Sequence, residues 1–317
     1  MTPIPLLIAA SLAIVAAPAL QAQTLWPDKP VRIIVPLPPG GPSDIVLRAA
    51  IEKMQPTLKQ PVLIDNKPGA SGNIGAAEAA RAAPDGQTWL WTTDTLVTVN
   101  PHVYQKLGFK PVDFAPVMRA TAFHQTLVCH PGLGLKTVAD LVGRAKTRPM
   151  SYASGGAGSP GHLTMELFKG AAGVEMTHVP YKGPAPALQD VMGAQVDCGF
   201  LAGPTVLPHV RAGKLVALAV SGASRSALLP EVPTMADSGY PGFDASFSLV
   251  LYAIKDTPTV IVDAMARALG SALQQADVVE RLRQSDQIVV AASPQDTATR
   301  LAADATKWAA VVKRIGL

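Results

Sequence analysis

Residues 31–58 read VRIIVPLPPGGPSDIVLRAAIEKMQPTL and contain one complete strand, loop and helix. The first five residues are rich in Val and Ile, which predicts a buried strand. The helix is predicted from apolar residues at spacings of four, three and four, which share one face: Leu47, Ile51, Met54 and Leu58. The glycine-rich loop between them places Pro42 in the first helical turn, where proline is tolerated. A strand, a glycine loop and an amphipathic helix are the building unit of α/β proteins.

The same unit recurs along the chain. Further strands are predicted at 62–64, 88–91, 126–129, 150–153, 176–179, 198–201, 215–220 and 247–253. Helices fit between most of them, and Thr137 with Asp140 forms a capping box at the start of one helix. Strands that alternate with helices predict an α/β fold with mostly parallel sheets, in two lobes that meet near residue 125. The irregular stretch 225–243 is where the chain returns to the first lobe.

The N-terminus has the pattern of a signal peptide. An apolar run from Leu6 to Ala17 is followed by small residues, and cleavage is expected after Ala22. The run is too short for a permanent membrane span. A buried N-terminal helix is the alternative, but the segment has no polar face. Residues 1–22 therefore predict export to the periplasm.

Composition excludes several function classes. Charged residues make up 16% of the chain, and the net charge of +4 comes from scattered rather than clustered basic residues. Clustered Lys and Arg with aromatic residues would mark a nucleic-acid binder, so none is predicted. The histidines and the two cysteines, Cys129 and Cys198, lack the spacing of metal ligands, so no metal site is predicted. After export the cysteines are either bridged or two buried thiols, and both alternatives stay open.

Four glycine-rich loops connect a strand to a helix. The first spans 36–44, where Gly40 and Gly41 expose backbone N–H groups at the positive end of a helix. Such an end binds anions. A plain turn capped by Ser43 or Asp44 explains the same residues. The other loops span 68–75, 154–162 and 181–184, and loops of this type converge at the carboxyl ends of strands.

The third loop also matches a dinucleotide pattern. Residues 156–161 read GAGSPG, which fits G-x-G-x-x-G and suggests a nicotinamide-dependent oxidoreductase. The next strand, however, ends without an acidic residue for a ribose, and Pro160 removes an N–H donor. No nucleophile elbow or paired catalytic carboxylates stand out. We therefore predict no enzyme, no catalytic residue and no cofactor.

Nine blocks in one order resemble the Bug family of periplasmic binding proteins, the solute receptors of tripartite tricarboxylate transporters. The blocks are 26–32 (WPDKPVR), 39–44 (PGGPSD), 66–75 (NKPGASGNIG), 84–86 (PDG), 113–117 (DFAPV), 158–163 (GSPGHL), 179–183 (VPYKG), 207–215 (LPHVRAGKL) and 232–235 (VPTM). The resemblance runs from about Trp26 to the C-terminus and implies a type II periplasmic-binding-protein fold. Lobe I is then 23–124 with 224–317, lobe II is 125–223, and the two close on the ligand like a Venus flytrap.

The resemblance also implies a site in the cleft that grips a carboxylate through backbone groups. Carried onto this sequence, the first lobe contributes Leu37, Pro38, Gly40, Gly41, Ser43, Asp44, Ser71, Gly72, Asn73, Thr93 and Asp94. The second lobe contributes Ser154, Gly158, Ser159, His162, Tyr181 and Gly183. Asp44 is expected to brace its own loop, with contact to a hydroxyl or amine of the ligand as the alternative. His162, at a helix start, is expected to act as a donor that faces the loop.

The sequence departs from the family at Leu37, at 199–203 (GFLAG), at 247–249 (FSL) and at 254–258 (IKDTP). These changes predict an apolar pocket wall and a ligand with an apolar body and one or two carboxylates. The expected partners are this ligand and membrane permease subunits, with the receptor itself a monomer. A sensor that docks on a signalling partner has the same fold and stays an alternative.

Overall fold

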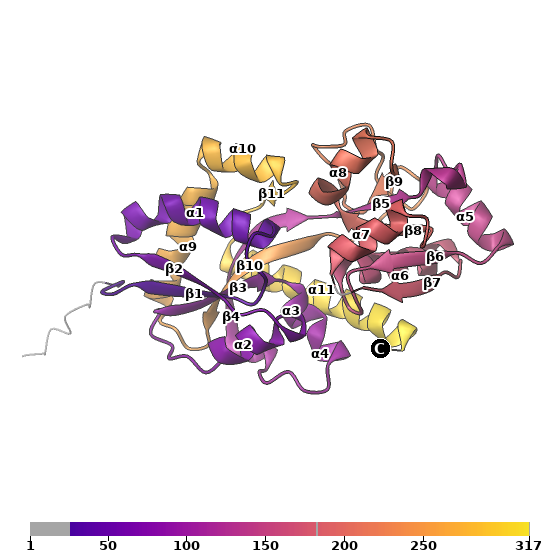
Figure 1. Cartoon of the computed structure of the whole chain (residues 1–317). Helices are drawn as coiled ribbons and strands as arrows, with labels where there is room; N and C mark the ends of the chain where they lie inside the picture. Colours follow the sequence, from indigo (N-terminus) through magenta and orange to yellow (C-terminus); the bar gives the residue numbers. More distant parts are fainter. Residues whose placement is uncertain (1–25, 182, 317) are drawn as a thin grey trace, which may run out of the picture.

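The computed structural model describes residues 26–181 and 183–316, and the predicted signal peptide lies outside them. Figure 1 shows two lobes, each built on its own sheet. The first sheet has the order β11-β4-β10-β3-β1-β2 and the second β7-β6-β8-β5-β9. The predicted two-lobed α/β architecture is therefore confirmed.

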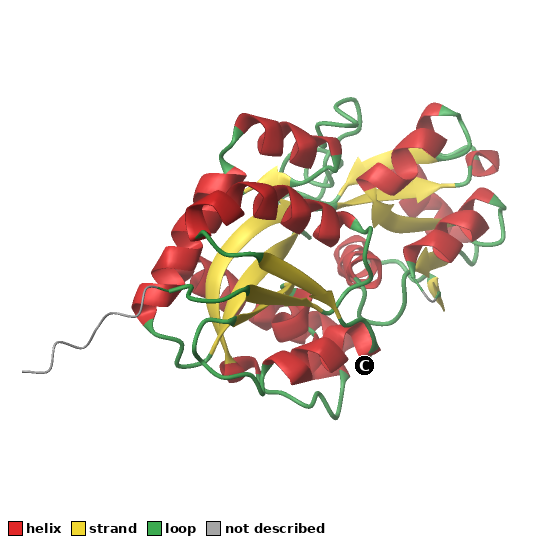
Figure 2. Ribbon diagram, turned by 60° about the vertical axis from the view of Figure 1, so that its left-hand side comes forward, coloured by secondary structure: helices red, strands yellow, loops and turns green. Residues whose placement is uncertain are grey.

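The first lobe joins the N-terminal third of the chain to its C-terminal part. Its strands are β1 (Val31–Val35), β2 (Val62–Asn66), β3 (Thr88–Thr93), β4 (Phe114–Phe123), β10 (Phe247–Ile254) and β11 (Ile288–Val289). Its helices are α1 (Pro42–Leu58), α2 (Asn73–Ala79), α3 (Thr95–Thr98), α4 (Asn100–Val103), α9 (Thr259–Leu273) and α10 (Ala276–Gln284), with short 3₁₀ turns at Ala70–Gly72 and Pro111–Asp113. The predicted apolar stripe of α1 is buried against β1, β3 and α9, so helices cover one sheet face. Helices α2 and α3 cover the other (Figure 2).

The second lobe is continuous in sequence. Its strands are β5 (Gln125–Cys129), β6 (Ser151–Ser154), β7 (Thr177–Pro180), β8 (Cys198–Ala202) and β9 (Val216–Val220). Its helices are α5 (Val138–Thr147), α6 (Pro160–Ala172), α7 (Pro184–Met192) and α8 (Gly203–Arg211), with a 3₁₀ turn at Pro131–Leu133. The predicted capping box is confirmed, because Thr137 Oγ1 accepts from the amide of Asp140 and the Asp140 carboxylate accepts from that of Thr137. Cys129 lies opposite Cys198 on β5 and β8, and both are buried free thiols.

Three connections join the lobes. Strand β4 runs into β5 around His124, and the chain re-enters the first sheet at Phe247. Between β9 and β10, Leu229 and Val232 pack on Val220 of the second sheet. The third connection is α11 (Pro294–Ile315), which packs on α3 and β4 of the first lobe and on α6 of the second (Figure 1). The exact lobe boundaries stay a prediction.

The sheets are mixed, which corrects the expectation of mostly parallel strands. Strands β1 and β6 pair in parallel with both neighbours, whereas β5 and β10 pair antiparallel with theirs. Strand β5 enters the second sheet directly from β4 of the first, and it lies between β8 and β9 and runs opposite to both. Strands β4 and β11 are not among the predicted strands. Pro116 interrupts the β4 pattern, and the β4–β10 register is irregular beside it.

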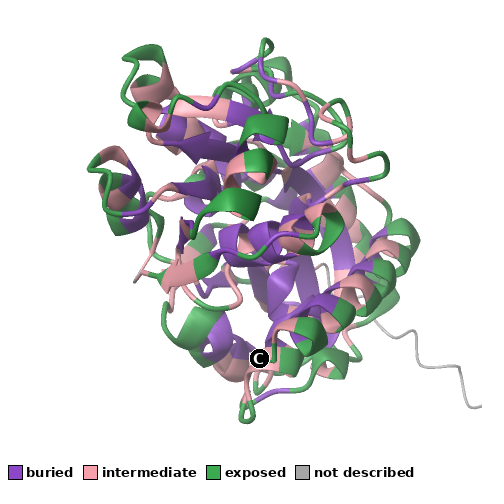
Figure 3. Ribbon diagram, turned by 90° about the vertical axis from the view of Figure 1, so that its right-hand side faces the viewer, coloured by how far each residue is buried: buried purple, intermediate pink, exposed green. Residues whose placement is uncertain are grey.

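Burial follows these layers. The largest fully buried side chains are mostly aromatic, and they include Trp89 and Trp91 on β3 and Trp308 on α11. Figure 3 shows buried backbone through the centre of the molecule and exposed segments on the outer helices. Trp308 of α11 stacks on Phe247 of β10 with ring centroids 5.2 Å apart, so the core continues from one lobe to the other. The glycine-rich loops therefore begin at the ends of strands whose side chains are buried in the core.

Candidate functional site: a cavity between the lobes

A cavity of about 300 Å³ lies between the two lobes. Twenty described residues line it: Leu37, Pro42, Ser43, Thr93, Phe123, His124, Gln125, Gly155, Ser159, Pro160, Gly161, Pro184, Phe200, Leu201, Ala202, Pro204, Leu249, Ser285, Asp286 and Gln287. They come from both sheets and from the β4–β5 connection. This volume is at the lower end of the range for small-molecule sites.

Four helices begin at this cavity. The lining includes the first residues of α1, α6, α7 and α8, each of which has a proline in its first turn. An α-helix carries roughly half a positive charge at its N-terminus. No lysine or arginine is among the described lining residues. The described lining therefore offers an anion backbone amides and helix ends rather than lysine or arginine side chains.

Several amides at these helix starts have no partner in the described part of the chain. Ser43 and Gly161 both line the cavity, and neither donates its N–H to a described residue. Gly161 cannot be larger, because an added Cβ would lie 2.3 Å from the carbonyl oxygen of Phe200. The last glycine of the G-x-G-x-x-G match, Gly161, thus allows α6 to pack closely on β8 at the edge of the cavity.

The first loop lies at the cavity, but one of its backbone amides is already bonded to a side chain of the same loop. The Asp44 carboxylate accepts hydrogen bonds from Gly40 N at 3.1 Å and from Arg48 Nε at 2.7 Å. Burial opposes ionisation of Asp44, but these two donors outweigh it and lower its pKa. Asp44 thus braces the loop, as expected, and occupies the Gly40 amide. Neither Pro38 nor Gly41 is among the lining residues, although Gly41 directly precedes Pro42.

The walls of the cavity are apolar. Leu37, Phe123 and Leu249 belong to the first lobe, and Phe200 and Leu201 to the second. Among the lining side chains, Thr93 Oγ1 bonds to Thr95 Oγ1 at 2.7 Å, so that hydroxyl is already engaged. Ser159 caps α6 through the amide of His162. An apolar wall with hydroxyls at the helix starts suits an amphipathic ligand.

The second loop does not line the cavity. Ser71 Oγ bonds to Tyr104 Oη at 2.6 Å, and Asn73 Oδ1 accepts from Asn100 Nδ2 at 2.7 Å. Gly72 packs on Pro36, at the end of β1. The second loop therefore connects α4 to the base of the first loop. The start of α8, rather than the second loop, lines the cavity.

The third loop is supported from behind by two stacked imidazoles. His178 Nε2 lies 2.6 Å from Ser154 Oγ, and His162 Nδ1 accepts from the amide of Gly158 at 3.1 Å. The two rings stack with centroids 4.0 Å apart. Burial lowers the pKa of both, that of His178 to about 4, where His162 adds to the effect. His162 is thus a neutral acceptor behind the loop rather than a donor that faces it.

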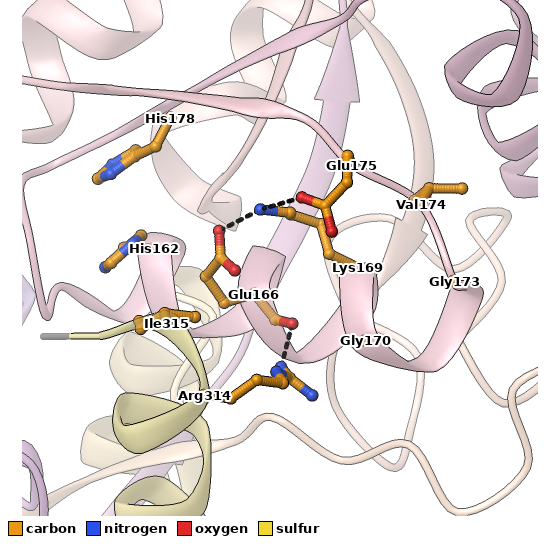
Figure 4. Close-up of a pocket in the computed structure, with 10 residues that line it drawn as sticks. All are labelled: His162, Glu166, Lys169, Gly170, Gly173, Val174, Glu175, His178, Arg314 and Ile315. Atoms are coloured by element: carbon orange, nitrogen blue, oxygen red, sulfur yellow. Dashed lines mark hydrogen bonds and ion pairs between the residues drawn. The ribbon is translucent and has the colours of Figure 1, made fainter.

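These rings border a separate cavity of about 530 Å³ in the second lobe (Figure 4). Its charged side chains pair with one another: Lys169 Nζ lies 2.8 Å from Glu166 and 3.5 Å from Glu175. Figure 4 shows Lys169 between the two glutamates, and Arg314 of α11 reaching the backbone carbonyl of Glu166. Because these charges already have partners, this region braces the third loop and α11.

Three other predicted residues lie outside the interlobe cavity. Tyr181 donates a hydrogen bond to Asp190 of α7 at 2.5 Å. Burial is the larger cause and this bond the smaller cause that together raise the pKa of Tyr181 to about 12. Gly183 is the N-cap of α7, next to the lining Pro184. Asp94 is fully buried. This burial, and to a smaller extent the charge of Asp304, raises the pKa of Asp94 to about 7. Asp94 therefore belongs to the interior near α11.

Of the predicted site residues, the structure brings Leu37, Ser43, Thr93 and Ser159 together on one cavity. Sequence reasoning missed the residues contributed by the β4–β5 connection, by the α8 start and by 285–287. The sequence signal for α8 was Gly203-Pro204 directly after a strand, which is the same pattern as the first loop. Residues 285–287 carry no motif and reach the cavity only through tertiary packing.

Within the described residues, no group of three or more His, Cys, Asp or Glu side chains is placed to hold a metal ion. None of the described helices is long and apolar enough to cross a membrane.

The model of the tripartite tricarboxylate transporter family receptors matches residues 46–317. The chain belongs to this receptor family. The protein BugT of Bordetella pertussis is 36% identical over 306 residues, which are 95% of this chain and 93% of that protein. Family membership confirms the resemblance seen in the sequence blocks.

Solved structures agree with this assignment. The R. palustris protein Rpa4515, solved with adipate, superposes with a TM-score of 0.82 at 34% identity and covers 92% of this chain and 98% of its own. MatC of Rhodopseudomonas palustris, solved with malate, gives 0.77 at 30% identity, with 90% and 100% covered. The periplasmic binding protein BugD gives 0.78 at 33%, with 92% and 99% covered. These relatives are solute-binding receptors, and this chain is a receptor rather than an enzyme.

Proposed function

We propose that this receptor captures a small carboxylate between its lobes. The observation that carries the proposal is the meeting of four helix starts at one cavity whose described lining has no lysine or arginine. The carboxylate sits between the starts of α1 and α6, where the amides of Ser43 and Gly161 donate to no described residue. Amides that point at a carboxylate form charge-assisted hydrogen bonds. The apolar body lies against Phe123, Phe200 and neighbouring side chains.

The proposal extends to the protein's place in the cell. The receptor works in the periplasm and delivers its ligand to the membrane subunits of a tripartite transporter. Support comes from the predicted signal peptide at residues 1–22 and from the family. Osmotic-shock fractionation with mass analysis of the mature N-terminus tests this: the protein should be released with the periplasmic fraction and should begin near Gln23. Retention in the cytoplasm with Met1 intact would contradict it.

Two matched variants of Ser159 test the carboxylate position. Ser, Asn and Asp are about equally good N-caps, so both Ser159→Asn and Ser159→Asp keep α6 capped. Only Asp adds a negative charge at the cavity. Like charges at a binding surface repel strongly, so the affinity for carboxylates should fall at least about tenfold in Ser159→Asp. Ser159→Asn should bind nearly as the wild type does.

The measurement is isothermal titration calorimetry of the purified protein with mono-, di- and tricarboxylates, after a thermal-shift screen of the same panel. A ligand at a hundredfold over its dissociation constant adds about 2.7 kcal/mol of stability, which such a screen detects. Chromatography of the mixture after incubation should return the ligand unchanged. Equal binding by both Ser159 variants would remove the carboxylate from the α6 start, and chemical conversion of the ligand would contradict a receptor.

A further inference from the structure

Asp286 places a buried carboxylate on the wall of the interlobe cavity. It lies between α10 and β11 and is 6% exposed. Its Oδ1 accepts a hydrogen bond from Ser226 Oγ at 2.6 Å, which fixes the orientation of the side chain. Its Oδ2 has no hydrogen-bond partner among the described residues. Buried polar atoms in native proteins nearly always have a partner, so this oxygen calls for one.

The backbone places Asp286 directly after the C-cap of α10. Asp286 has a φ of 54°, in the left-handed region that favours glycine. A side chain is nevertheless present there, and it lies close enough to the α8 start that a Cβ on Gly203 would be 2.1 Å from Oδ2. This φ is the usual one for the residue after a helix end, because the amide of Asp286 donates to the carbonyl of Arg283 and that of Gln287 to the carbonyl of Leu282.

No described lysine or arginine forms an ion pair with this carboxylate. His124 is the nearest basic group, with its Nε2 at 3.6 Å from Oδ2, and this nitrogen also lacks a hydrogen-bond partner. Burial lowers the pKa of His124 although the charge of Asp286 raises it, which disfavours a protonated ring beside this carboxylate. No lysine or arginine is among the described lining residues. Buried charges are normally paired, and Asp286 is among the residues that line the ligand space.

We infer that the ligand is an aminocarboxylate, whose carboxylate lies at the α1 and α6 starts and whose ammonium group pairs with Asp286. The inference rests on the proposed function and adds the second recognition point. The apolar side chains that line the cavity, such as Phe123 and Phe200, fit a hydrocarbon body between the two charged groups. A dicarboxylate would bring a second negative charge to Asp286 and is disfavoured.

Three acids with the same six-carbon skeleton separate the possibilities: caproate, adipate and ε-aminocaproate. Calorimetric titration should show ε-aminocaproate bound at least about tenfold more tightly than the other two, because a desolvated charge pair across an interface discriminates strongly. Matched sets of four to eight carbons extend the comparison to other lengths.

Substitution of Asp286 should remove this preference. Asp286→Asn keeps the shape without the charge, and Asp286→Gly suits the positive φ and covers the case in which Asn does not fold. In both variants ε-aminocaproate should bind no more tightly than caproate. Asp277→Asn is the control, because Asp277 is an exposed acid on α10 of the same lobe and should leave the order of affinities unchanged.

The outcomes distinguish this inference from the proposed function. If caproates or diacids of any length bind as tightly as the amino acids, and Asp286→Asn changes nothing, the inference is overturned while the carboxylate receptor stands. If no carboxylate of any length binds the wild type, the proposed function itself fails.

Discussion

Replacing Asp94 by Asn should stabilise the protein at neutral and alkaline pH but not at pH 4. Asp94 is completely buried, and burial and the nearby charge of Asp304 raise its pKa from 3.8 to about 7. In the unfolded chain this carboxyl group ionises at its ordinary pKa. The folded protein therefore holds the proton more tightly, and unfolding releases it at any pH between the two values.

The sign and size follow from proton linkage. The folded protein binds more protons than the unfolded chain between pH 3.8 and about 7, so its stability falls as the pH rises through this range. The two pKa values differ by roughly three pH units, and each unit corresponds to about 1.4 kcal/mol. Ionisation of Asp94 therefore lowers the free energy of unfolding by at most about 4 kcal/mol. The loss is complete above pH 7. Asn cannot ionise and is exempt from it.

The assay is urea unfolding of wild type and Asp94→Asn at pH 4, 6 and 8. The difference in unfolding free energy between the two proteins should grow by about 4 kcal/mol in favour of Asn from the lowest to the highest pH. Other titrating groups cancel in this difference because both proteins share them. A difference that stays constant with pH would refute the reasoning and would place an ionised, well-solvated carboxylate at this position.

Three further outcomes are expected. Trp308→Ala should lower the unfolding free energy by about 3–5 kcal/mol in a urea titration, because the ring is completely buried; a smaller loss would mean that the lobes do not share a core. Gly203→Ala should weaken ligand binding in calorimetry, because the new methyl group would lie 2.1 Å from Asp286 Oδ2, whereas Gly143→Ala meets open space and should bind normally. The NMR signals of His178 should titrate near pH 4, and stability should fall as the pH drops from 6.5 towards that value, since the folded protein disfavours the protonated ring; an ordinary titration near 6.5 would contradict its burial.

The sequence predicted the parts of the fold that depend on local pattern. The strand at Val31–Val35 with its glycine loop and helix, and the capping box at Thr137, are specified by residues close together in the chain. Strand β4 was missed because Pro116 lacks the N–H of a regular strand residue. The mixed strand directions were missed because they depend on how the chain crosses between lobes, which no local pattern encodes.

The candidate site divides in the same way. Glycine loops placed Ser43 and Ser159 correctly at helix starts, because the preference for such residues there is local. Ser71 and Asn73 have the same chemistry, but their side chains bond to α4 and its flank, so the tertiary structure uses them as supports. Asp286 could not be found from the sequence, since only folding brings it beside the α8 start.

Helix α11 also limits how the receptor can move. Its 22 residues form a rod of about 33 Å that is anchored near the first sheet through the bond from Arg119 N to Thr297 Oγ1, and beside α6 through Arg314. A rod held at both ends opposes a wide separation of the lobes, because such a movement would have to break one of these two contacts. Ligand capture should therefore leave the overall dimensions of the particle in solution nearly unchanged, which small-angle X-ray scattering with and without ligand would measure.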